Sequence, residues 1–171
     1  LFHYFFCIFI GALLVLGFSP FSLGFLGILC PAFLLWLTHQ SKPKQAFWAY
    51  FCFGIGLYGF GISWVYISIA RFGGQPAWIA ALITGLFIAV LSSYTGLLGW
   101  LIRRLAKKPL HQLWIIPGLW TVFEILRAWI LTGFPWLDLG ITQLSSPLRG
   151  FAPIGSVYLV SFMTVLASVL I

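Results

Sequence analysis

Acidic residues are what this sequence lacks most. Glu124 and Asp138 are the only two acidic side chains among 171 residues, and charged residues of all kinds make up 6% of the chain. Soluble domains carry roughly one quarter charged residues. Hydrophobic residues make up 62% of the chain, more than a soluble fold of this length could remove from water. This composition excludes an ordinary soluble domain.

Several other features are also missing. Apolar and polar residues do not alternate strictly, which excludes a membrane β-barrel. Cys7, Cys30 and Cys52 are isolated in apolar stretches without CxxC spacing, so we predict neither a disulfide nor a metal site. The net charge of +7 does not indicate a nucleic-acid partner, because most of the basic residues lie in two short loops. The letters Gly54-Ile-Gly-Leu-Tyr-Gly59 match a dinucleotide-binding motif, but they lie inside an apolar run without a preceding strand, so no cofactor is predicted.

Long uncharged apolar segments are what the sequence has in abundance. Residues 46–70 and 77–102 each exceed the roughly twenty residues that a helix needs to cross a bilayer. Lipid offers the backbone no hydrogen-bond partner, so such segments must be helical. The predicted fold is therefore all-α, a polytopic transmembrane helical bundle of about six spans. The predicted spans are residues 1–18, 24–37, 46–70, 77–102, 113–131 and 154–171.

The ends of the chain lead to an expectation about its extent. The sequence begins at Leu1 rather than at a methionine, and it stops inside the apolar run 157–171. We interpret residues 1–171 as a single transmembrane domain that is truncated at both ends.

The connecting loops differ sharply in basic charge. The second and fourth loops hold Lys42, Lys44, Arg103, Arg104, Lys107 and Lys108. The first loop has no basic residue, the third has only Arg71, and the fifth has only Arg149. Positive charge is concentrated in cytoplasmic loops, which predicts a cytoplasmic N-terminus and outward-facing loops at 71–76 and 132–153. The latter loop is rich in proline, glycine and aromatic residues, and we expect it to lie at the outer membrane surface.

Two ionisable residues lie inside a predicted span. Glu124 and Arg127 are three positions apart within residues 113–131, so they share one helix face. Charges in a span usually face the protein interior and pair with one another. We predict a structural ion pair between them and rank it above a direct functional role.

Aromatic residues, glycines and one arginine converge on the predicted outer side. Aromatic belts account for most residues of this kind, but an arginine beside flexible glycines and aromatic rings could hold a lipid phosphate. The predicted substrate and lipid-binding residues are Trp64, Tyr66, Arg71, Gly73, Gly74, Phe134, Pro135 and Trp136.

The same stretches carry a family resemblance. Residues 62–74, 124–129 and 131–136, together with Ser19-Pro-Phe21 and residues 146–154, resemble in the same order the membrane region of bacterial apolipoprotein N-acyltransferases. The resemblance extends over nearly all of the chain. It implies a multi-pass enzyme of the bacterial inner membrane that moves an acyl chain from a phospholipid donor to the N-terminal S-diacylglyceryl cysteine of a diacylated lipoprotein acceptor.

The resemblance also implies where the chemistry takes place. The family uses a Glu-Lys-Cys set in a nitrilase-like domain that follows the membrane region, and this chain ends before it. None of the three cysteines matches the family's nucleophile, so we assign no catalytic residue and expect the 171 residues to be inactive alone.

Two other classes of protein stay open at this point. Glu124 and Arg127 could line the substrate path of a transporter or permease fragment. Transporters commonly contain an internal repeat, and the loop 132–153 has no counterpart in residues 1–85. A purely structural membrane subunit is the third alternative.

Overall fold

Helices make up all the regular structure of residues 2–130 and 133–171, the part of the chain that the computed structural model describes. The all-α prediction is therefore confirmed. In chain order the elements are α1 (Phe2–Leu14), η1 (Val15–Gly17), α2 (Leu26–Thr38), α3 (Pro43–Gly61), α4 (Trp64–Ile67), η2 (Ser68–Phe72), α5 (Ala77–Leu105), α6 (Pro109–Trp129), η4 (Leu139–Gln143), η5 (Pro147–Phe151) and α7 (Ala152–Val169).

The predicted apolar segments all contain helices, and two of them are interrupted, one at Ile62 and one at Gly155 and Ser156. The predicted span 77–102 corresponds to α5, whereas the predicted span 46–70 ends as an α-helix at Gly61 and restarts at Trp64. The axis bends by 51° between the two parts. Ile62, between them, has left the helical conformation, with φ −122° and ψ 19°. Residues 1 and 131, at the ends of two predicted spans, lie outside the described residues.

Helix length and composition separate two groups of helices. Within the described residues, α5 and the stretch Pro147–Val169 are each long and apolar enough to cross a membrane. The backbone of the second stretch leaves the helical conformation at Gly155 and Ser156. The bent pair Pro43–Gly61 and Trp64–Phe72 would make a third span if counted as one. The helical stretches His3–Gly17 and Leu26–Thr38 are apolar but shorter.

Helix α3 lies between α1 and α5, and glycines permit its close approach to both. A Cβ atom on Gly56 would collide with the backbone of Ile8 in α1. On the other side, a Cβ on Gly54 would collide with Ser92 and Thr95 in α5. These two glycines therefore act as small residues that let helix backbones approach.

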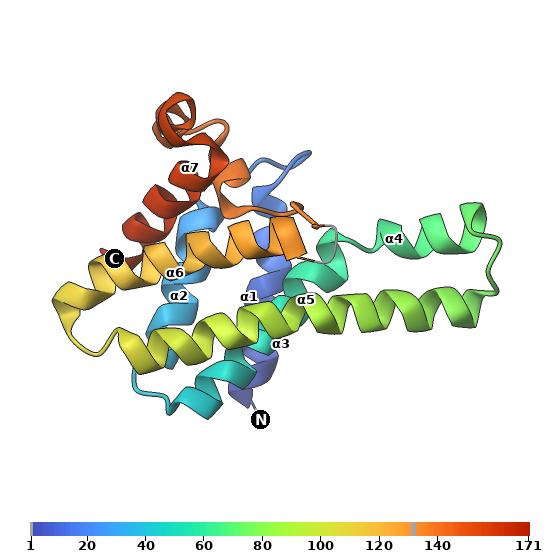
Figure 1. Cartoon of the computed structure of the whole chain (residues 1–171), viewed down its shortest axis with the longest axis horizontal. Coiled ribbons are helices and arrows are strands. Elements are labelled where there is room, and N and C mark those ends of the chain that lie inside the picture. The colour runs from blue at the N-terminus through green and yellow to red at the C-terminus, as the bar shows by residue number, and fades with distance from the viewer. Residues whose placement is uncertain (1, 131–132) are drawn as a thin grey trace.

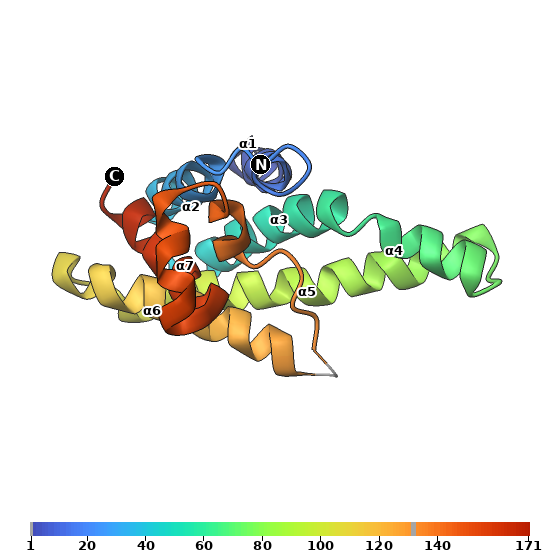
Figure 2. The same cartoon turned by 90° about the horizontal axis from the view of Figure 1, so that it is seen from above.

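The molecule consists of a helical body and a projecting arm (Figure 1). We define the arm as residues 64–86, which comprise α4, η2 and the facing turns of α5. Both views show the arm extending away from the body, with the turn at residues 73–76 at its far end (Figures 1 and 2). Its apolar side chains, among them Phe72 and Trp78, are exposed. In a membrane protein such side chains can face lipid.

Candidate functional site

Helix α6 presents three polar side chains toward the interior of the body. Trp120, Glu124 and Arg127 are spaced four and three residues apart, so they lie along one helix face. All three are buried. Because a buried charge is costly without partners, their hydrogen bonds determine how the neighbouring segments pack.

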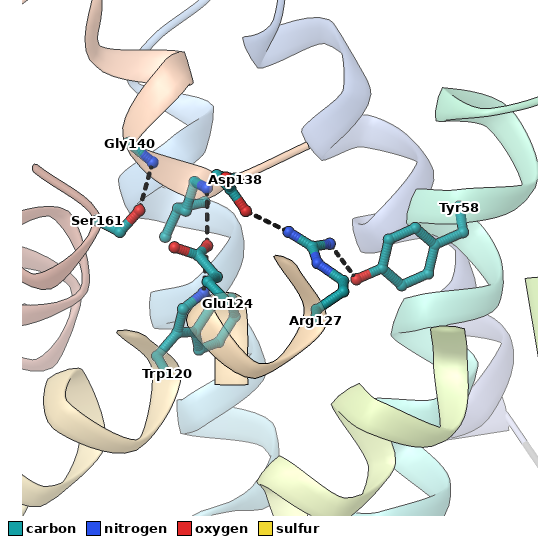
Figure 3. Close-up of polar contacts among 8 residues, drawn as sticks. Tyr58, Trp120, Glu124, Arg127, Asp138, Gly140 and Ser161 are labelled. Carbon is teal, nitrogen blue, oxygen red and sulfur yellow. Dashed lines mark hydrogen bonds and ion pairs between the residues drawn. The ribbon is translucent and has the colours of Figure 1, made fainter. Parts of the chain in front are cut away.

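Arg127 joins three parts of the chain (Figure 3). Its Nη1 donates a hydrogen bond of 2.5 Å to the Tyr58 hydroxyl oxygen in α3. Its Nη2 forms an ion pair with Asp138 Oδ1, in the segment just before η4. This is the only ion pair within residues 2–130 and 133–171. The guanidinium therefore links α6, α3 and the connection between α6 and α7.

Glu124 has a different role from the one that the sequence suggested. Its Oε1 accepts hydrogen bonds from the backbone N–H of Leu139 at 2.8 Å and from Trp120 Nε1 at 3.2 Å. The predicted pairing of Glu124 with Arg127 is thus corrected, because Arg127 pairs with Asp138 instead. The two side chains leave the same helix face but turn toward different partners, since the backbone of η4 lies beside one and Asp138 beside the other (Figure 3).

The connection after α6 is hydrogen-bonded to the body, and part of it is buried there. We call residues 133–151 the loop. The Gly140 N–H donates to Ser161 Oγ of α7 at 2.8 Å, and Gln143 Nε2 donates to the Gly24 carbonyl at 2.8 Å. Asp138, Thr142 and Gln143 are buried, so this part of the loop inserts into the body rather than lying at the surface.

Two glycines make room for this insertion. A Cβ on Gly140 would collide with the Val157 carbonyl of α7. A Cβ on Gly27 of α2 would collide with the Thr142 side chain. The loop therefore packs directly against the backbones of two helices.

The charges in this cluster do not balance. The cluster holds one guanidinium and two carboxyl groups, and Glu124 Oε2 and Arg127 Nε have no hydrogen-bond partner among the described residues. Burial raises the pKa of the Asp138 carboxyl above its ordinary value, and the Arg127 guanidinium opposes that rise. A cavity of about 30 Å³ beside Glu124 and Arg127 has room for a single water molecule.

An aromatic cluster lies where the arm meets the loop. The rings of Phe134 and Trp136 stack with centroids 5.6 Å apart, and the Trp64 ring lies 5.8 Å from Trp136. The ring of Phe87 in α5 packs edge-on against that of Phe134, with centroids 5.0 Å apart. Trp136 stays 48% exposed, so the cluster presents apolar surface to its surroundings.

A pocket connects the aromatic cluster with the buried charges. It has a volume of about 210 Å³ and lies between α5, α6 and the loop. Its lining residues are Phe87, Val90, Leu91, Tyr94, Arg127, Ile130, Gly133 and Phe134. Apolar walls with one cation at the side suit the acyl chain of a lipid whose polar group lies near that cation.

The structure brings together only part of the predicted lipid-binding set. Trp64, Phe134 and Trp136 form the aromatic cluster, with Pro135 between two of them. Arg71, Gly73 and Gly74 instead lie around the turn at the far end of the arm, and Tyr66 lies in α4. The turn that carries Arg71, Gly73 and Gly74 therefore lies away from the body, at the far end of the arm (Figures 1 and 2).

Sequence reasoning missed the residues that bind Arg127 and hold the loop. Tyr58, Asp138 and Ser161 were not singled out, although Asp138 is one of only two acidic residues in the chain. That scarcity was the available signal, because a lone acid in a membrane protein needs a partner. Tyr58 and Ser161 carry no comparable signal, since hydroxyl side chains are common in helices.

The described residues contain no group of three histidine, cysteine or acidic side chains that could hold a metal ion. The three cysteines are free, and Cys7 and Cys30 lie within the hydrophobic core. These two thiols therefore serve packing. What the site offers is a fixed loop, an aromatic surface and an apolar pocket.

Comparison with known proteins extends these observations. Residues 10–170 match the family model described as the apolipoprotein N-acyltransferase N-terminal domain. The apolipoprotein N-acyltransferase of Vibrio vulnificus is 43% identical over 157 residues, which are 91% of this chain and 31% of that protein. The Coxiella burnetii enzyme of the same name is 42% identical over 161 residues, covering 92% of this chain and 33% of the relative. The chain thus spans about a third of the length of the curated relatives it matches.

Proposed function

The chain belongs to the family of apolipoprotein N-acyltransferase N-terminal domains, and on that basis we propose that it is a membrane domain serving lipoprotein acylation. The complete enzyme would transfer an acyl chain from a phospholipid to the N-terminal S-diacylglyceryl cysteine of a lipoprotein. In this proposal residues 1–171 form a single domain in the bacterial inner membrane. The Glu-Lys-Cys set that performs the thioester chemistry lies outside these residues, so they are inactive by themselves.

Contacts between loops support the alternation of spans in the proposed six-span topology, and the proposed cytoplasmic N-terminus rests on the basic charge of the second and fourth loops. The two basic loops meet, because Arg103 Nε donates a 3.2 Å hydrogen bond to the Ser41 carbonyl. The arm and the loop, which are expected on the opposite side, meet through Trp64 and Trp136. Loops that alternate along the chain are therefore paired, as six alternating spans require.

The observation that carries the functional proposal is the aromatic cluster beside the 210 Å³ pocket. We assign this pocket to an acyl chain. Aromatic and aliphatic side chains form most of its lining, and such surface gains free energy when it buries a hydrocarbon chain. Trp64, Phe134, Pro135 and Trp136 would form the edge over which the chain passes.

The outer end of the arm has a separate part in this proposal. Arg71 is exposed there beside Gly73 and Gly74, and Tyr66 is exposed on α4. A cation beside glycines can approach a lipid phosphate closely. The arm would thus contact lipid head groups at a distance from the acyl chain pocket.

A substitution in the complete enzyme tests the role of the aromatic cluster. Trp136→Ala should lower acyl transfer from phospholipid to a diacylated lipopeptide about tenfold, because a desolvated aromatic anchor contributes on the order of 1–2 kcal/mol to binding. Trp48→Ala is the matched control. Trp48 is 53% exposed and also packs against two aromatic rings, Phe47 and Phe51, but it lies on α3 near the basic loops.

The two variants together decide the proposal. Trp48→Ala should leave acyl transfer close to wild type. Equal losses in both variants, or no loss in Trp136→Ala, would contradict the assignment of the acyl chain to this pocket.

Thiol labelling of two cysteine variants tests the proposed orientation in the membrane. Lys107 and Ser145 are both exposed, whereas Thr142 is buried and unsuitable for labelling. Cysteine placed at position 145 should react with an impermeant thiol reagent in intact spheroplasts, and cysteine at position 107 only after lysis. The reverse pattern would overturn the proposed topology.

A further inference from the structure

A second pocket lies at the opposite end of the body, where the ends of α2, α5, α6 and α7 meet. It has a volume of about 260 Å³. Its polar lining comes from Thr38, His39, Arg103, Gln112 and Ser168. Its apolar lining includes Leu35 and Trp36 of α2 and Ile116 of α6. The pocket therefore combines a polar side with an apolar side.

The surroundings of this pocket are strongly basic and have no acidic neighbours. Arg104, Lys107 and Lys108 are exposed near Arg103, and Lys44 is exposed in the other basic loop. The only two carboxyl side chains of the chain, Glu124 and Asp138, are buried in the cluster around Arg127. No side-chain carboxylate can therefore neutralise the basic end, and its charge remains available to an outside anion.

Arg103 is fixed by one hydrogen bond, and its other N–H donors remain available. Its Nε donates to the Ser41 carbonyl at 3.2 Å, and no other hydrogen bond of its side chain is found among the described residues. An arginine has five N–H donors in a rigid planar group. Four of these donors are left, and two of them can bind the oxygens of one phosphate together.

The opposite wall of the pocket faces outward and is apolar. Trp36 is 65% exposed and lies one helical turn from Ala32, and Leu35 also lines the pocket. Exposed apolar residues on a membrane helix contact lipid chains. A phosphate at Arg103 would therefore lie next to a surface for hydrocarbon.

We propose that this pocket is a binding site for an anionic phospholipid, distinct from the acyl chain pocket and not consumed in the reaction. The lipid phosphate binds Arg103 and the second N–H of the Gln112 amide, whose first N–H donates to the Ala106 carbonyl at 3.3 Å. The acyl chains run along Ala32, Leu35 and Trp36. Basic pockets between membrane helices are known to suit the head groups of anionic lipids. The bound lipid acts as the counter-ion that the protein itself lacks at this end.

Lipid titration of the purified protein in detergent tests the proposal. Phosphatidylglycerol should raise the thermal unfolding midpoint in a saturable manner, since a ligand that binds the folded state stabilises it. Phosphatidylcholine, which has no net charge, should have a much smaller effect. Inorganic phosphate at the same concentration should have little effect, because it cannot use the apolar wall. An equal shift of the unfolding midpoint with inorganic phosphate would mean that the pocket binds anions in general and is not a lipid site.

Arg103→Gln should weaken phosphatidylglycerol binding about tenfold, the loss expected when one charge-assisted contact to a phosphate is removed. Arg149→Gln is the matched control. Arg149 carries the same charge, is exposed on the loop and also donates to a backbone carbonyl, that of Leu144. Equal weakening in both variants would mean that net charge alone attracts the lipid, and the site would be rejected.

A second variant covers the case in which Arg103→Gln does not fold. Gln112→Glu keeps the size of the side chain and leaves the bond between Arg103 and Ser41 intact, while it removes the 3.3 Å hydrogen bond from Gln112 Nε2 to the Ala106 carbonyl. Gln112 lies in the first turns of α6, where an acidic side chain is favourable to the helix. The new carboxylate would compete for Arg103 and repel the lipid phosphate, so phosphatidylglycerol binding should again fall about tenfold. Unchanged binding in this variant would overturn the proposal.

Discussion

The arm and the loop are similar in amino-acid composition but differ in how far they are exposed. Both connect long helices, both contain glycine, proline and aromatic residues, and each has one arginine in its connecting segment. The loop inserts into the body, where Asp138 is only 2% exposed. The arm projects away from it, and Phe72 is 88% exposed.

The difference follows from where each connection finds hydrogen-bond partners. The loop receives them from side chains of the body, because Glu124 accepts from the Leu139 N–H and Ser161 from the Gly140 N–H. The arm satisfies its backbone locally, as in the bond from the Gly73 N–H to the Ser68 carbonyl. A connecting segment can be buried only where its polar groups are satisfied. The fixed loop and the exposed arm then meet at Trp64 and Trp136.

The largest effect is expected from removing the carboxylate that holds the loop. Asp138→Ala should destabilise the protein by about 3–5 kcal/mol, because it leaves the buried Arg127 guanidinium without its ionic partner. Unfolding in detergent with increasing denaturant measures the change. A loss below about 1 kcal/mol, which is typical of exposed ion pairs, would mean that the loop is not anchored by this pair.

A double-mutant cycle sharpens the same point. Arg127→Met combined with Asp138→Ala should cost less than the sum of the two single changes, because the double variant leaves neither side chain of this pair without its ionic partner. Arg127→Met combined with Glu124→Gln should be closer to additive, since these two side chains form no ion pair in the structure. Stronger coupling to Glu124 than to Asp138 would restore the pairing that the sequence suggested.

A smaller loss is expected from filling the space between the loop and α7. Gly140→Ala should destabilise by about 2–3 kcal/mol, because the added Cβ would collide with the Val157 carbonyl and force the loop outward. The thermal unfolding midpoint in detergent would report it. The same experiment on Gly150→Ala, a loop glycine with no atom within 4 Å of an added Cβ, is the control and should show little change.

Removing a single hydroxyl should have a still smaller effect. Ser161→Ala should cost about 1–2 kcal/mol, because the Gly140 N–H loses its acceptor inside the body. Ser93→Ala is the control, since the Ser93 hydroxyl bonds only within its own helix, to the Ala89 carbonyl. Equal stability changes in the two variants would show that the bond to the loop adds nothing.

The smallest effect, and the only gain, is expected in the arm. Gly85→Ala should stabilise by about 0.5–1 kcal/mol, because alanine is the better helix former and the added Cβ would have no atom within 4 Å. A slightly higher unfolding midpoint would confirm it. A loss comparable to that of Gly140→Ala would mean that the arm is packed as tightly as the loop.

Much of the fold could be predicted from the sequence because it depends on local composition. The uncharged run 77–102 predicted α5. The convergence of Trp64 with Phe134 and Trp136 was also predicted, from loop alternation. The break at Ile62 was not, because residues 46–70 are uncharged throughout and no proline marks the end of the helix.

Only the tertiary structure decided which carboxylate faces Arg127. Spacing along α6 identifies Glu124 as a neighbour, but it cannot show that the backbone of Leu139 binds this carboxylate or that Asp138 reaches the guanidinium. Those contacts depend on the path of the loop, which turns at Gly133 with φ +81° and inserts where Gly140 meets α7. The sequence by itself determined a helical membrane protein and its family, because hydrophobicity is a property of each segment. The partner of a buried charge depends on distances between segments, and only the folded chain sets them.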